Sequence, residues 1–155
     1  MTKVGDIMVE DVVAFKPSDP IHFAAWSLRT KRISGAPVVE GKKVVGVVSE
    51  RDIMRLLEEK NIEINLFLPS PLDVIEFPVK MKKELDEISE IVTKTAKTPV
   101  EEIMTKKAIT VTLDTSVGEA AKLMGSKKIN RLPVVDYNGD LIGILTRGDV
   151  IGTLV

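Results

Sequence analysis

The stretch that decides the fold is VEEIMTKKAITVTLDTSVGEAAKLMGSKKINRLPVVDYNGDLIGILTRGDV, residues 100–150. An earlier part of the chain, residues 4–57, repeats its short motifs in the same order. The offset between matching positions is 96 residues, as from Met8 to Met104, and becomes 97 after the turn that follows Asp136. A constant offset is the mark of a tandem structural repeat. The clearest matches are Ile7-Met8 with Ile103-Met104, Ala24-Ala25 with Ala120-Ala121, and Pro37-Val38-Val39 with Pro133-Val134-Val135.

Each copy predicts a short strand followed by a helix. The strands are expected near residues 12–15 and 109–111. Asp19 before Pro20 is typical of a helix start, and Ser116 lies at capping-box spacing from Glu119. Apolar residues then recur with the period of one buried helix face. They are Ile21, Ala24, Ala25 and Leu28 in the first copy, and Val117, Ala120, Ala121 and Met124 in the second.

Two β-branched runs follow in each copy and predict a hairpin. They are residues 37–39 with 44–48, and residues 133–135 with 141–145. Gly41 and the Asn138-Gly139 pair supply the turns. Ser49 and Thr146 then open a last helix in each copy. We therefore expect an α/β fold that mixes helix and strand in two β-α-β-β-α repeats.

Composition excludes several classes of function. The 155 residues carry 22 basic and 23 acidic side chains, a net charge of −1, so no overall field draws the chain to nucleic acid or to a membrane. Without cysteine, and with His22 as its one histidine, the chain offers no thiolate or imidazole metal site. The stretch MTKVGDIMVE lacks an apolar core, and no apolar run approaches the roughly 18 residues of a membrane span, so we expect a cytoplasmic protein.

The chemistry of the chain is concentrated at two strand-to-helix turns. Ser49-Glu50-Arg51-Asp52 and Thr146-Arg147-Gly148-Asp149 each follow a strand that begins with glycine. A hydroxyl and free N–H groups at a helix start favour phosphate, and the aspartate can accept hydrogen bonds from both hydroxyls of a ribose. The same spacing also describes plain N-capping, in which the two side chains only satisfy helix N–H groups. The residues alone leave both interpretations open.

Residues 4–57 and 100–155 resemble the cystathionine-β-synthase (CBS) domain family, whose members occur as such tandem pairs. The resemblance implies two copies related by a pseudo-twofold axis, with an adenine nucleotide or adenosyl ligand in clefts between them. One cleft would combine Thr146, Arg147 and Asp149 with Met8, Val13, Ser34 and Gly35. The other would combine Ser49, Arg51 and Asp52 with Met104, Ile109, Asn130 and Arg131.

The two clefts differ in the charges that phosphate would meet. Glu50 would repel phosphate beside Asp52, so we expect the Asp149 cleft to bind better by a small margin. Arg131 and Arg147 are the favoured partners for phosphate, ahead of the lysine pair Lys127-Lys128, which suits a helix end.

The resemblance implies a regulatory sensor that binds AMP, ADP, ATP or S-adenosylmethionine, needs no cofactor and forms a homodimer through its helices. We expect no enzyme, because the sequence shows no nucleophile with a base and no phosphate loop. The alternative is a ligand-free dimerisation scaffold that recruits a regulated protein partner. Phe23 and Trp26 stand where the second copy has Glu119 and Lys122, which implies a covering partner, either the middle segment of the chain or a second subunit.

The expected organisation is a first repeat at residues 1–57, an insert at 58–99 and a second repeat at 100–155. The insert begins as a proline-containing apolar arm and continues as an amphipathic helix, with Met81, Leu85, Ile88 and Val92 at helical spacing. It either packs across the repeats or forms a surface for a partner.

Overall fold

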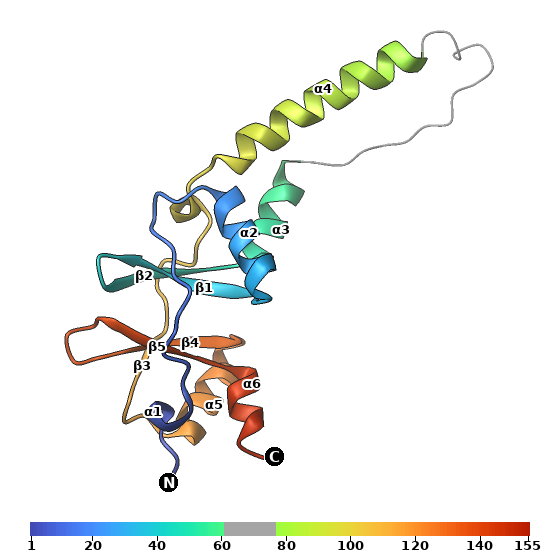
Figure 1. Cartoon of the computed structure of the whole chain (residues 1–155). Coiled ribbons are helices and arrows are strands. Elements are labelled where there is room, and N and C mark those ends of the chain that lie inside the picture. The colour runs from blue at the N-terminus through green and yellow to red at the C-terminus, as the bar shows by residue number, and fades with distance from the viewer. Residues whose placement is uncertain (61–76) are drawn as a thin grey trace.

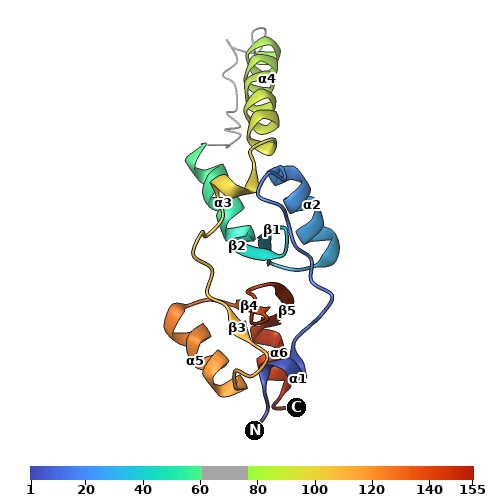
Figure 2. The same ribbon diagram turned by 90° about the vertical axis from the view of Figure 1, so that its left-hand side faces the viewer.

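The structure is a computed structural model that describes residues 1–60 and 77–155. Two small sheets face each other at the middle of the molecule, with a pair of helices on the outer side of each (Figures 1 and 2). The first repeat contains α2 (Ile21–Lys31), β1 (Gly35–Glu40), β2 (Lys43–Ser49) and α3 (Glu50–Glu59). The second contains β3 (Val111–Thr112), α5 (Val117–Lys127), β4 (Arg131–Val135), β5 (Leu141–Thr146) and α6 (Arg147–Gly152). The remaining elements are α1 (Val4–Ile7), α4 (Phe77–Ala96) and a 3-10 turn, Val100–Glu102.

Both predicted hairpins are confirmed. Strands β1 and β2 pair antiparallel, as do β4 and β5, and Gly46 and Gly143 take matching places opposite Val38 and Val134. Gly41 and Gly139 form the turns with φ of +64° and +82°, a region that glycine enters without a steric penalty. Because the two hairpins have the same register, the strand-to-helix turn after each hairpin starts from the same backbone geometry.

The first strand of each repeat is shorter in the structure than predicted. In place of a strand at residues 12–15, Phe15 alone forms a parallel bridge with Val38. Its N–H donates to Pro37 O (3.0 Å), and its carbonyl accepts from Val39 N (2.8 Å). The next N–H of a parallel ladder would come from Pro17, which has none, so the pairing stops there. In the second repeat β3 pairs with β4, and it starts two residues later and ends one residue later than expected.

The helix starts differ from each other. Ser116 caps α5 as predicted, because its hydroxyl accepts from Glu119 N at 3.1 Å. Asp19 does not cap α2; its carboxylate accepts from Lys16 N at 2.8 Å, inside the preceding turn, and Pro20 occupies the N-cap position. Burial follows the predicted helix faces, with Ile21, Ala24, Leu28, Ala120 and Met124 buried and Ala25, Ala121 and Val117 partly buried.

The two repeats exchange their entry segments. Val4, at the start of the first repeat, is fully buried in the core of the second, while Val100, at the start of the second, is fully buried in the core of the first. Backbone bridges repeat this exchange, joining Val9 to Ile144 and Thr105 to Val47. Because each core is completed by residues that belong to the other copy in sequence, the arrangement of the two sheets is held by both cores and not by surface contact alone.

The insert contains the predicted helix. Helix α4 spans Phe77–Ala96, and its C-terminal end leads through Thr98, whose carbonyl accepts from Ile21 N at 2.8 Å. Figures 1 and 2 both show α4 extending away from the sheets. The expectation that the insert packs across the repeats is therefore wrong for its helix. The predicted extended arm falls largely in residues 61–76, outside the described residues.

Candidate functional site

The two strand-to-helix turns are closed by the same set of hydrogen bonds. Asp52 Oδ2 accepts from Ser49 N (2.8 Å) and Ser49 Oγ (3.1 Å), and Ser49 Oγ accepts from Asp52 N (3.4 Å). Asp149 and Thr146 repeat the arrangement at 2.8, 2.9 and 3.3 Å. The capping interpretation is therefore confirmed at both turns. It does not exclude a ligand, since each capping box uses only one carboxylate oxygen.

A cavity of about 450 Å³ opens beside Asp52 and is walled by both repeats. This size is within the range of small-molecule sites in proteins. Six residues predicted from the sequence for one cleft line it together: Ser49, Arg51, Asp52, Ile109, Asn130 and Arg131. The buried carboxylate of Asp52 keeps its Oδ1 outside the capping box, 3.9 Å from Arg55 Nη1. The cavity thus offers one carboxylate oxygen, several cations and an apolar wall.

Arg131 crosses from the second repeat to the first. Its guanidinium donates to Ser34 Oγ and lies over Gly35, where a Cβ would come within 2.6 Å of Arg131 Cζ. Partial burial lowers the pKa of Arg131, and the attraction of Asp52 and Glu50 only partly opposes that effect. Ser34, which we expected beside Asp149, therefore lines the Asp52 cavity, and Gly35 makes room for the arginine.

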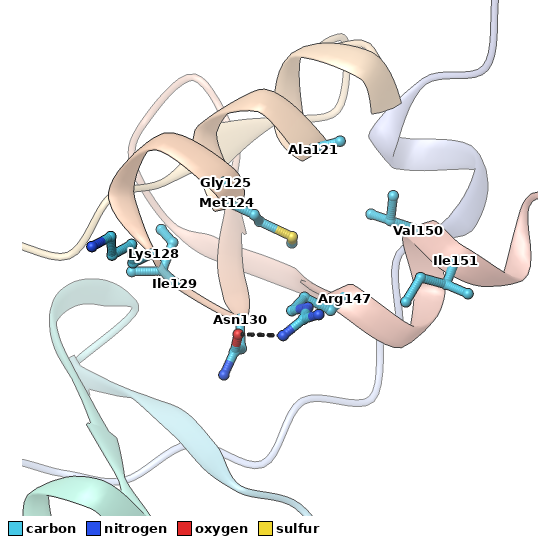
Figure 3. Close-up of a pocket in the computed structure, with 9 residues that line it drawn as sticks. All are labelled: Ala121, Met124, Gly125, Lys128, Ile129, Asn130, Arg147, Val150 and Ile151. Carbon is cyan, nitrogen blue, oxygen red and sulfur yellow. Dashed lines mark hydrogen bonds between the residues drawn. The ribbon is translucent and has the colours of Figure 1, made fainter.

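The residues expected around Asp149 are not gathered in the same way. Arg147 and Asn130 line a second cavity of about 440 Å³ between α5 and α6, with Arg147 Nη1 3.4 Å from Asn130 Oδ1 (Figure 3). Apart from these two side chains and Lys128, its walls are apolar or glycine, and they belong to the second repeat alone. The other lining residues are Ala121, Met124, Gly125, Ile129, Val150 and Ile151.

The two methionines and Val13 take packing roles. Met104 covers Gly46 and Met8 covers Gly143, so that a Cβ at either glycine would come within 2.6 Å of the methionine sulfur. Val13 packs against the core of the first repeat. For these three residues, which the resemblance implied as cleft residues, the geometry supports core packing.

Sequence reasoning missed several residues that line the Asp52 cavity. Arg55 lies one turn beyond Asp52 on α3, a spacing that could have pointed to it. Lys107 had no such signal, because it enters the cavity only through the exchange of the segment that opens the second repeat. The other missed residues are Val47, Thr105, Ala108 and Ile129.

The part of the chain that the structure describes lacks two features, a metal-binding cluster and a membrane-spanning helix. Residues 1–60 and 77–155 contain no cluster of three or more side chains suited to hold a metal ion. Within the same ranges, no helix combines the length and apolar character that crossing a membrane demands.

Comparison with known proteins identifies the repeat. The family model described as "CBS domain" matches twice, at residues 4–59 and 100–155. Over 153 residues the chain is 43% identical to the uncharacterized protein MJ1426 of Methanocaldococcus jannaschii, covering 98% of this chain and 90% of that protein. It is 35% identical to the chloroplastic CBS domain-containing protein CBSX2 of Arabidopsis thaliana, covering 96% of this chain and 61% of that protein.

Solved structures share the fold. A crystal structure of CBSX2 in complex with AMP superposes with a TM-score of 0.71 at 30% identity, covering 99% of this chain and 96% of that one. The CBS domain pair of protein MJ0100 from a complex with 5-methylthioadenosine and S-adenosyl-L-methionine superposes with a TM-score of 0.73 at 24% identity, covering 99% and 96%. The pair of repeats is thus a known architecture.

Proposed function

The chain belongs to the CBS-domain family, and from that premise we propose that it is a regulatory binding module that takes an adenine nucleotide or related adenosyl ligand in the cavity beside Asp52. One observation carries the proposal: the cavity of about 450 Å³ is walled by both repeats and contains a buried carboxylate with one oxygen outside its capping box. The AMP complex of CBSX2, a relative with the same fold, supports this class of ligand.

The cavity has a place for each part of such a ligand. Asp52 Oδ1 can accept hydrogen bonds from ribose hydroxyls, because a carboxylate oxygen has two lone pairs. Val47, Ala108 and Ile109 provide an apolar wall for a base. The N-terminus of α3, a helix of ten residues, adds its dipole to the cationic side chains that would face phosphate.

We place the ligand beside Asp52 and not beside Asp149, against the ranking that the sequence favoured. Helix α6 has only six residues, and the cavity that Arg147 lines belongs to one repeat. A ligand held by both repeats can bias their relative arrangement, since it binds one arrangement better than another. A ligand held by one repeat does not favour one arrangement of the two repeats over another. The proposed regulatory role depends on such a preference.

A thermal-shift panel of adenosine, AMP, ADP, ATP and S-adenosylmethionine tests the proposal. A ligand present at 100 times its dissociation constant stabilises the folded state by about 2.7 kcal/mol. For a chain of this size that energy corresponds to a rise in Tm of roughly 5–10 °C. We expect such a rise with at least one member of the panel. If none of the five moves Tm at millimolar concentration, the proposal is wrong and the scaffold alternative gains.

We also propose that the protein is a homodimer in which outer helices face each other. Phe23 and Trp26 on α2 are 41% and 63% exposed, and Ile151 on α6 is 55% exposed beside the apolar cavity of Figure 3. Sedimentation velocity at micromolar concentration should give a dimer. Ile151→Asp should shift it toward monomer, because the new charge would be buried in the contact. Tyr137→Asp, at an exposed hairpin turn, is the matched control that should leave the dimer intact. A native monomer for the unmodified chain contradicts the proposal.

A further inference from the structure

The cavity beside Asp52 has a charge opposite to that of the whole chain. Five cationic side chains and two anionic ones line it, whereas the chain as a whole has a net charge of −1. We infer that this cavity selects adenosyl ligands that carry phosphate over those that carry a sulfonium, and that Arg131 and Glu50 set the preference in opposite directions. The inference rests on the proposed function. The cationic residues are Arg51, Arg55, Lys107, Lys128 and Arg131, and the anionic ones are Glu50 and Asp52.

The excess of positive charge matters because the ligands differ by charge at one end. Adenosine and its phosphates share the base and the ribose, so their contacts with Asp52 and the apolar wall are the same. S-adenosylmethionine replaces the phosphates by a positively charged sulfur that carries an amino-acid chain with one positive and one negative group. Its net charge is therefore +1, which cationic side chains in a partly enclosed site repel. Asp52 offers that sulfur little compensation, because one of its oxygens is in the capping box and the other lies 3.9 Å from Arg55 Nη1.

Arg131 is the cation whose surroundings most favour an added anion. Among the described residues its guanidinium has one hydrogen-bond partner, the uncharged hydroxyl of Ser34. Burial and the repulsion of Arg51 lower the pKa of this side chain more than Asp52 and Glu50 raise it, so a further counter-charge would stabilise its charged form. A phosphate oxygen would supply the missing counter-charge, and an arginine-phosphate pair is among the stronger hydrogen-bonded contacts in proteins.

Glu50 acts in the opposite sense from the first turn of α3. It is exposed, lines the cavity and attracts Arg131, so it competes with a phosphate for the same cation. The matching position of the second repeat is Arg147, so this acidic side chain is specific to the Asp52 turn. Removing the charge of Glu50 should therefore strengthen phosphate binding, the reverse of what loss of a structural residue would do.

Isothermal titration calorimetry of the full chain with adenosine, AMP, ADP and S-adenosylmethionine tests the inference. We expect ADP to bind about 10-fold or more tightly than adenosine, and S-adenosylmethionine to bind more weakly than adenosine. Arg131→Gln should cost ADP about 10-fold in affinity while changing adenosine by no more than about twofold, since a neutral amide can still contact Ser34. Glu50→Gln should raise the affinity for ADP about two- to fivefold. Lys122→Gln, on α5 outside this cavity, is the control that should change nothing.

The outcomes separate this inference from the proposed function. If S-adenosylmethionine binds as tightly as ADP, or if Arg131→Gln weakens adenosine and ADP equally, the inference is wrong while the binding function stands. If no member of the series binds the unmodified protein, both are wrong. Glu50→Gln keeps the test decisive even if Arg131→Gln folds poorly, because unchanged or weaker ADP binding by the Glu50 variant also overturns the inference.

Discussion

Replacing Asp52 by asparagine is expected to weaken binding of the best adenine nucleotide about 30-fold or more with little change in folding stability. The carbonyl oxygen of asparagine can still accept from Ser49 N and Ser49 Oγ, so the capping box is kept. The other carboxylate oxygen becomes an NH₂ group, which donates and cannot accept from a ribose hydroxyl. Losing charge-assisted hydrogen bonds to both hydroxyls corresponds to about 2–4 kcal/mol of binding free energy.

Asparagine is the more informative replacement, because alanine would change both ligand binding and folding stability. Asp52→Ala would also remove the carboxylate half of the capping box, which accepts from Ser49 N, at a cost of about 1 kcal/mol in folding free energy. Calorimetry with Asp52→Asn, together with a denaturant unfolding curve, separates the two effects. Asp149→Asn is the matched control, since its capping box has the same geometry. Loss of affinity in the Asp149 variant with none in the Asp52 variant would restore the ranking that the sequence favoured.

Gly46→Ala is expected to destabilise the fold by up to about 3 kcal/mol, at the upper end of what overpacking costs. A Cβ on Gly46 would lie 2.6 Å from Met104 Sδ and 2.8 Å from the backbone oxygen of Thr105. The methionine can move, but Thr105 is held by two backbone hydrogen bonds to Val47, of 3.0 and 2.9 Å. The substitution therefore pushes apart the bridge through which the second entry segment joins the first repeat.

The matched variant is Gly143→Ala. Its Cβ would meet Met8 Sδ at 2.6 Å, but the nearest backbone atom, the oxygen of Val9, is 3.1 Å away. Because a flexible side chain yields more easily than a backbone bridge, we expect a smaller loss of stability than for Gly46→Ala. Urea unfolding of both variants gives the comparison. Equal losses, or a larger one at Gly143, would show that the clash with the backbone does not decide the effect.

Local signals in the sequence were sufficient for the repeat and for most of its elements. Gly41 and Asn138-Gly139 identify hairpin turns because the required backbone conformation depends on the turn residues themselves. The Ser49 and Thr146 caps follow from the same kind of short-range hydrogen bonding. One local signal failed because of a competing local bond: the Asp19 carboxylate closed its own turn and left Pro20 at the start of α2.

The sequence by itself determined the two repeats, their hairpins and the aspartate at each helix start, because these depend on contacts between residues a few positions apart. The family resemblance grouped six of the residues that line the Asp52 cavity, and only the tertiary structure decided the others. Lys107 lines the cavity with Asp52 because of the exchanged entry segment, and Arg131 reaches Ser34 across the interface, over a glycine that leaves it room. Such neighbours are set by how the two sheets pack, and no periodicity within one repeat encodes that arrangement.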